Sequence, residues 1–80
     1  MYNILCIRTC SGYPTSDVHL NGLTLNRVMD ILLDDFTMAH MVEDHGESLE
    51  FTARCLNAVD TFLVTGPANE LDHIRDMYSM

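Results

Sequence analysis

The hydrophobic pattern begins with a mostly apolar run over residues 2–9. A short run rich in apolar and β-branched residues predicts a strand that is buried for most of its length. Residues 11–17 read Ser-Gly-Tyr-Pro-Thr-Ser-Asp, a cluster that is typical of a loop. Residues 18–20 then predict a short second strand, and Asn21-Gly22 predicts a tight hairpin turn at its end.

A helical pattern starts after Thr24, whose hydroxyl suits the N-cap of a helix that begins at Leu25. The apolar residues that follow recur at the spacing of one helix face, and they are Leu25, Val28, Met29, Leu32 and Phe36. The pattern leaves the end of this helix open. It stops near Asp35 or runs on to Glu43.

Two interpretations compete for residues 36–42. A continued helix would end before Gly46 as a C-cap, whereas an extended segment would form a hairpin with the following strand. That following strand is clear, because apolar residues alternate with polar ones over residues 49–55. A helix ending at Glu43-Asp44 would place two acids at its negative dipole end, so we prefer the hairpin.

The remaining pattern predicts a turn over residues 57–60, a short strand over residues 61–65 and a final helix. Pro67 suits the first turn of that helix, and Leu71 and Ile74 begin its apolar face. The predicted fold is a single α+β domain over residues 1–80. It has a small antiparallel sheet of three to four strands with two helices packed on one face.

Charge narrows the class of partner. The chain has 12 acidic residues against four arginines, without any lysine, and its formal net charge is −8. Such a chain repels nucleic-acid phosphates and anionic membranes, so we expect it to bind neither directly. No stretch approaches the roughly 18 apolar residues of a membrane span, and the cytoplasm is the expected location. A basic protein surface is the partner that this charge would attract.

The residues that could support metal, redox or catalytic chemistry lack a recognised spacing. Cys6, Cys10 and Cys55 are an odd number, and their spacing fits neither a disulfide framework nor a zinc knuckle, so we predict free thiols. His40 and His45 flank Glu43-Asp44, but this spacing matches no standard zinc motif. We therefore predict no metal site, no cofactor and no enzymatic activity.

The acidic residues are concentrated in the middle of the chain, between Asp30 and Glu50. The alternative to a binding surface is a solvated acidic face. We predict that these carboxylates form a recognition surface, and its candidate residues are Asp30, Asp34, Asp35, Glu43, Asp44, Glu47 and Glu50.

In composition alone, the compact acidic chain resembles small phage-encoded inhibitors of host defence nucleases, some of which present carboxylates in place of phosphates. That resemblance implies a non-enzymatic, anti-defence module that mimics nucleic acid and docks on a basic nucleic-acid-handling protein such as a nuclease. The alternative function is a homo-oligomeric binder of a small ligand such as a nucleotide, for example a homodimer. In that case the loop from Cys10 to Asp17, with Arg8 or Arg27, would form the site at a subunit interface.

Overall fold

The structure is a computed structural model. It describes residues 1–34, 38–55 and 57–78, with Cys55 through its backbone alone. The elements, in chain order, are β1 (Tyr2–Cys10), β2 (Ser16–Leu23), α1 (Leu25–Leu32), β3 (His40–Asp44), β4 (Ser48–Cys55), β5 (Ala58–Thr65) and α2 (Ala68–Tyr78). This is an α+β fold, as the sequence predicts.

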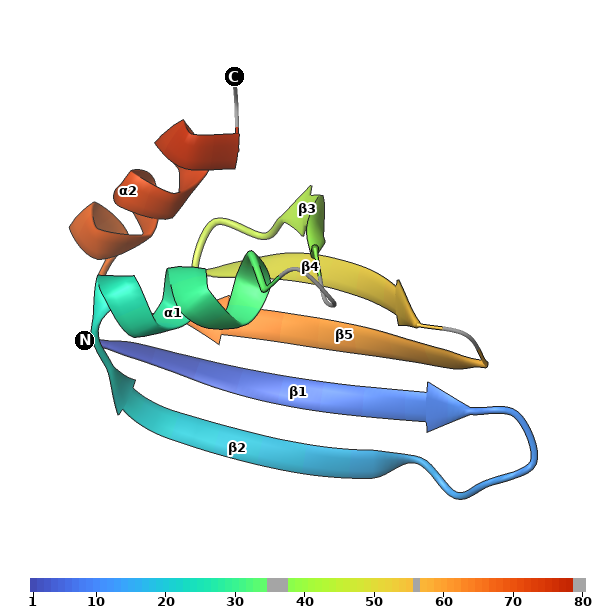
Figure 1. Ribbon diagram of the computed structural model, residues 1–80. Helices are drawn as coiled ribbons and strands as arrows, with labels where there is room; N and C mark the ends of the chain where they lie inside the picture. The colour runs from blue at the N-terminus through green and yellow to red at the C-terminus, as the bar shows by residue number, and fades with distance from the viewer. Residues whose placement is uncertain (35–37, 56, 79–80) are drawn as a thin grey trace.

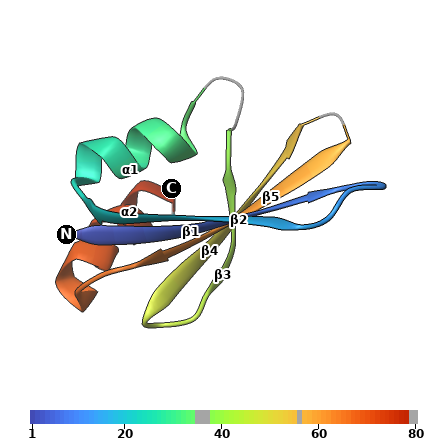
Figure 2. The same ribbon diagram turned by 90° about the horizontal axis from the view of Figure 1, so that it is seen from below.

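Within the described residues, five strands form one antiparallel sheet in the order β2-β1-β5-β4-β3 (Figure 1). The prediction of three to four strands was too low. Helix α1 connects β2 at one edge to β3 at the other edge, so the chain crosses the sheet between them. Seen from below, the strands fan out with a pronounced twist, and α1 lies to one side of them (Figure 2).

The strand register explains the core. Ile4, Val64 and Leu49 lie side by side across three strands, and Phe62 and Phe51 are partners in the next row of the same face. These strand residues belong to one buried cluster, to which both helices also contribute. The helical members are Val28, Leu32, Leu71 and Ile74.

The predicted hairpin turn at Asn21-Gly22 is wrong, because β2 continues through it to Leu23. The register with β1 shifts at this point: Tyr2 pairs with Leu23, but Ile4 pairs with Leu20. Gly22 has a φ of 68° and its backbone N–H donates to the Asn3 side chain at 3.0 Å. The Asn-Gly pair therefore forms a bulge inside the strand, where glycine supplies the left-handed conformation.

The N-cap prediction is confirmed, since the Thr24 hydroxyl accepts a hydrogen bond from the Arg27 backbone N–H at 3.3 Å. Helix α1 ends at Leu32, and the Ala39 backbone N–H then donates to the Leu32 carbonyl at 2.8 Å. The chain is extended again from His40, so the hairpin is correct over residues 40–55. Phe36, the last residue of the predicted apolar stripe, lies outside the described residues.

The predicted turn over residues 57–60 is too long, because β5 already starts at Ala58. Asp60 is consequently a strand residue, paired in register with Arg8 of β1. The final helix is confirmed as α2, and the Pro67 carbonyl accepts from the backbone N–H groups of Glu70 and Leu71 at 3.0 Å each. No helix in the described part of the chain has the length and apolar character needed to cross a membrane.

Candidate functional site

The β3–β4 hairpin separates two acids that are adjacent in the sequence. Glu43 lies directly opposite Glu50, whereas Asp44 lies opposite the buried Leu49, and the register shifts between Met41 and Glu43. Neighbouring residues of a strand point to opposite faces of the sheet. Glu43 therefore shares a face with Glu50, while Asp44 is directed toward the core side of the sheet and α2.

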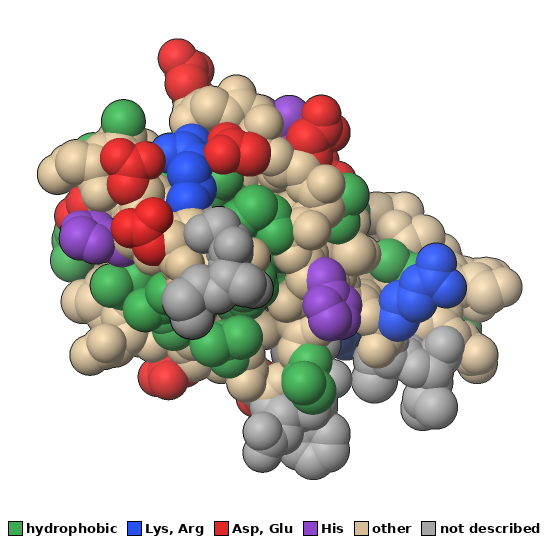
Figure 3. Space-filling view, turned by 90° about the horizontal axis from the view of Figure 1, so that it is seen from above, with side chains coloured by type: hydrophobic (Ala, Val, Ile, Leu, Met, Phe, Trp, Pro, Cys, Tyr) green, Lys and Arg blue, Asp and Glu red, His purple; other side chains and the backbone are tan. Residues whose placement is uncertain are grey.

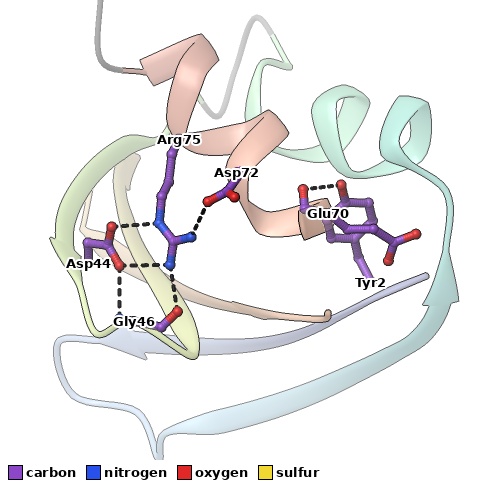
Figure 4. Close-up of polar contacts among 6 residues, drawn as sticks. All are labelled: Tyr2, Asp44, Gly46, Glu70, Asp72 and Arg75. Carbon is purple, nitrogen blue, oxygen red and sulfur yellow. Dashed lines mark hydrogen bonds and ion pairs between the residues drawn. The ribbon is translucent and has the colours of Figure 1, made fainter. Parts of the chain in front are cut away.

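Arg75 of α2 binds this second acid. Its Nε and one terminal nitrogen donate to the two Asp44 carboxylate oxygens at 2.6 and 3.1 Å, and its other terminal nitrogen donates to Asp72 at 2.7 Å (Figure 4). A further bond from Arg75 reaches the Gly46 carbonyl in the hairpin turn. The guanidinium thus connects the tip of the hairpin to α2 through one side chain.

Hydrogen bonding stabilises the charged form of Asp44. The Arg75 guanidinium lowers the pKa of this carboxyl, and the Gly46 backbone N–H, at 2.9 Å from it, lowers that pKa further. The same contacts, first with Asp44 and then with Asp72, raise the pKa of Arg75. The Asp44 carboxylate and the Arg75 guanidinium are therefore both charged at neutral pH, and the two-pronged contact orients the carboxylate.

The opposite face of the hairpin carries a histidine between two glutamates. His45 Nε2 lies 3.0 Å from a Glu50 carboxylate oxygen and 4.0 Å from one of Glu43. The hydrogen bond to Glu50 raises the pKa of His45, and the charges of Glu43, Glu50 and Asp44 add to that increase. The imidazole is therefore a better base here than in water.

Of the residues predicted for the site, four lie on this hairpin: Glu43, Asp44, Glu47 and Glu50. Glu43 and Glu50 are brought together at His45, and Asp44 is brought to α2 instead. Asp30 is exposed on α1 and Asp34 follows that helix, so neither lies on the hairpin. Asp35 lies outside the described residues.

The sequence interpretation missed Asp72 and Arg75, both on α2. Their spacing of three residues is a usual signal for an ion pair on a helix face, and the structure shows this pair. The link from Arg75 to Asp44 joins residues far apart in the chain, and no local spacing could indicate it.

The acidic residues are segregated toward one end of the molecule. With the exception of Asp17 and Asp60, every acidic residue that the structure describes lies on α1, on α2, directly after α1 or on the β3–β4 hairpin. We call this set the acidic pole, and it comprises Asp30, Asp34, Glu43, Asp44, Glu47, Glu50, Glu70, Asp72 and Asp76. Seen from above, acidic side chains gather around a basic one at the end that carries the helices (Figure 3).

The other end of the sheet has a different electrostatic character. Arg8 donates to both carboxylate oxygens of Asp60 at 2.7 and 2.9 Å, and this bond raises the pKa of Arg8. Beside the pair lies an open pocket of about 280 Å³, and its lining residues are Cys6, Arg8, Ser16, Val18, Leu20 and Phe62. Cys6 and Cys10 are free thiols, and burial, with the charge of Asp60, raises the pKa of Cys6.

Comparison of the chain with models of protein families, with curated proteins and with solved structures found no match.

Proposed function

We propose that the protein is a non-enzymatic binding module that docks its acidic pole on a basic surface of another protein. The observation that carries the proposal is the segregation of carboxylates on the helices and the β3–β4 hairpin. Among the described residues, nine acidic residues lie there with three arginines, Arg27, Arg54 and Arg75, and Arg75 is already bound to Asp44 and Asp72. The pole therefore keeps a strongly negative field.

The fold supports a common orientation for these charges. Buried residues of both helices share one cluster with one face of the strands. We infer from this that α1 and α2 pack on the same face of the sheet. Arg75 then holds the hairpin tip against α2, so that Asp44 of the hairpin and Asp72 of α2 are presented together.

Parts of the pole are well suited to contact a partner. The side chains of Glu43 and Asp72 are 65% and 66% exposed, although each lies next to a positive or titratable group of the protein itself. Exposed charges of one sign accelerate association with an oppositely charged surface and select against partners of the same charge. Specific contacts would come from the carboxylates that Arg75 already orients.

The partner class follows from the same charge. A basic surface that is shaped to bind phosphates is typical of nucleic-acid-handling proteins such as nucleases. Fixed carboxylates on a surface that repels nucleic acid would occupy such a site without being a substrate. Inhibition of a nuclease by mimicry of nucleic acid is therefore the mode of action that we propose.

The test compares charge reversals that differ only in position. Asp30→Lys and Glu47→Lys change two exposed acids of the pole, and Asp17→Lys makes the same change of net charge at the other end. The tagged proteins are used to capture partners at low salt from a nuclease-treated lysate, followed by elution with rising salt. We expect the wild type and Asp17→Lys to retain the same basic protein, and the single variants Asp30→Lys and Glu47→Lys each to lose it at a lower salt concentration.

Two results would contradict the proposal. One is retention of a partner that is equal in all variants, because the position of the charge would then not matter. The other is recovery of no basic protein by the wild type. Circular dichroism of each variant excludes unfolding as the cause of a loss.

The alternative function, a homo-oligomeric binder of a small ligand such as a nucleotide, has one observation in its favour. Arg8 lines the pocket of about 280 Å³, close to the lower size of ligand pockets in proteins. However, Asp60 neutralises the Arg8 guanidinium, so an anionic ligand would have to compete with it. Thermal stabilisation by a member of a nucleotide panel, lost in Arg8→Ala, would favour this alternative.

A further inference from the structure

The outer face of the β3–β4 hairpin brings two glutamates of the acidic pole together with a histidine. Glu43 and Glu50 are direct cross-strand partners, and like charges in that position destabilise an antiparallel pair. His45 lies between them, and the donor atoms of the three side chains all lie within 4.8 Å of one another. Two carboxylates and an imidazole thus converge on one point.

We propose that Glu43, His45 and Glu50 form a binding site for a divalent transition-metal ion of the Zn²⁺ type, with water completing the coordination. Three protein ligands with an open position for water are the usual arrangement of such an ion at a site that is not purely structural. The ion would also remove the repulsion between the two glutamates. This inference does not require a protein partner. It differs from the sequence analysis, which predicts no metal site.

The distances suit this coordination. Ligand atoms about 2.0–2.2 Å from a tetrahedral ion lie roughly 3.4 Å from one another. His45 Nε2 is 3.0 Å from Glu50 and 4.0 Å from Glu43, so the observed separations bracket that value. The Glu43 side chain is 65% exposed and can adjust its position without disturbing the core.

The surrounding contacts fix which groups are available as ligands. The backbone N–H of His45 donates to the Ser48 carbonyl at 2.9 Å, which closes the turn that carries the imidazole. Asp44, although adjacent in sequence, has both carboxylate oxygens bound to Arg75 and is directed away. The geometry therefore limits the site to three side chains instead of the whole acidic sequence around them.

The imidazole determines the kind of ion. Carboxylates alone suit Mg²⁺ and Ca²⁺, which prefer oxygen ligands, whereas a histidine nitrogen favours Zn²⁺ and its neighbours in the transition series. Whether metal binding depends on His45 is therefore a separate test of the site. An acidic surface that merely attracts cations would not depend on that nitrogen.

The experiment is isothermal titration of the EDTA-treated protein with Zn²⁺ at about pH 8, because Zn²⁺ binds the neutral form of an imidazole. We expect one Zn²⁺ site per chain. Its affinity should fall more than about tenfold in His45→Gln and in Glu50→Gln. Glu47→Gln is the matched control, because it removes a carboxylate from the same turn without removing a ligand. It should leave the affinity within a factor of two of the wild type, on the order of 0.4 kcal/mol.

The site is disproved if Zn²⁺ does not bind, if His45→Gln binds as the wild type does, or if Glu47→Gln weakens binding as much as Glu50→Gln. Zinc bound by the thiols instead would persist in His45→Gln, and so falls under the second outcome. Melting curves of the metal-free variants show that each one is folded. No partner protein enters this titration, so its failure would leave the docking proposal unaffected, and failure of the capture experiment would leave the metal site unaffected.

Discussion

Arg75 and Asp44 lie 31 residues apart in the chain, yet the guanidinium of one donates to both carboxylate oxygens of the other. The pair joins α2 to the edge strand β3, which would otherwise be held to the fold by its pairing with β4. An edge strand of five residues is a weak element by itself. We therefore regard this ion pair as the contact that fixes the position of the hairpin tip.

Replacement of Arg75 by alanine is expected to lower the melting temperature at neutral pH by a few degrees. Arg75→Lys should recover only part of the loss, because an ammonium cannot donate in the same two-pronged way to Asp44. Differential scanning calorimetry in EDTA measures both variants. Equal melting temperatures for the wild type and Arg75→Ala would show that the contact does not stabilise the fold.

The same pair predicts a dependence on pH. Because Arg75 lowers the pKa of Asp44 in the folded chain, the unfolded chain binds a proton there first as the pH decreases. The stabilisation is complete above the ordinary aspartate pKa of about 3.9 and is lost as the pH falls through the lowered value. In Arg75→Ala, the melting temperature should therefore fall less between neutral and acid pH than it does in the wild type. Melting temperatures measured against pH with EDTA present test this.

The sequence predicted the regular parts of the fold because local patterns determine them. Thr24 is followed by an apolar helical stripe, and residues 49–55 alternate cleanly, so α1 and β4 were predicted close to where they lie. The errors occur where long-range pairing overrides a local signal. Asn21-Gly22 looks like a hairpin turn, but pairing with β1 carries the strand through it as a bulge.

The sequence indicated which residue types form the candidate site, but it did not indicate how they are arranged in space. The acidic middle of the chain is visible in the sequence, but alternation along β3 sends Glu43 and Asp44 to different faces. Asp72 lies near the hairpin because Arg75 of α2 contacts both Asp72 and Asp44, and the contact to Asp44 spans 31 residues of the chain. A pattern of charges along a chain therefore indicates a surface without indicating which charges share it.

The N-cap of α1 gives a prediction of defined size. Thr24→Ala removes the oxygen that accepts from the Arg27 N–H and should cost about 1 kcal/mol of unfolding free energy. For a domain of this length that is a decrease of about 4–8 °C in melting temperature. Thr24→Ser retains the hydroxyl and is the control. A loss of similar size in Thr24→Ser would assign the effect to the methyl group instead of the cap.

Tyr78 presents the opposite case, a polar group whose removal should not harm the protein. Its hydroxyl is buried without a hydrogen-bond partner among the described residues, and burial raises its pKa. The ring packs against Phe51 with centroids 4.9 Å apart, a contact that phenylalanine would keep. Because an unpaired buried hydroxyl costs about 1–3 kcal/mol, Tyr78→Phe should be as stable as the wild type or more so.

Urea denaturation tests this prediction, with Tyr13→Phe as a control at a side chain that is 76% exposed. The control should leave the midpoint unchanged. A clearly lower midpoint for Tyr78→Phe would mean that the hydroxyl has a partner in solution.

The ion pair between Arg8 and Asp60 should respond asymmetrically to mutation. The Asp60 side chain is 11% exposed, whereas that of Arg8 is 56% exposed. Arg8→Ala leaves a mostly buried carboxylate without the guanidinium that binds both of its oxygens, and such an uncompensated charge is strongly destabilising. Asp60→Ala leaves a guanidinium that water already reaches. We therefore expect Arg8→Ala to be the more destabilised variant.

The double variant separates this explanation from a simple loss of contact area. Once Asp60 is alanine, removal of Arg8 no longer strands a buried charge, so the double variant should be close in stability to Asp60→Ala and less destabilised than the sum of the single changes. Urea midpoints for the four proteins, interpreted at equal m-values, complete the cycle. Additive losses, or a greater loss in Asp60→Ala than in Arg8→Ala, would show that desolvation of the carboxylate does not govern this pair.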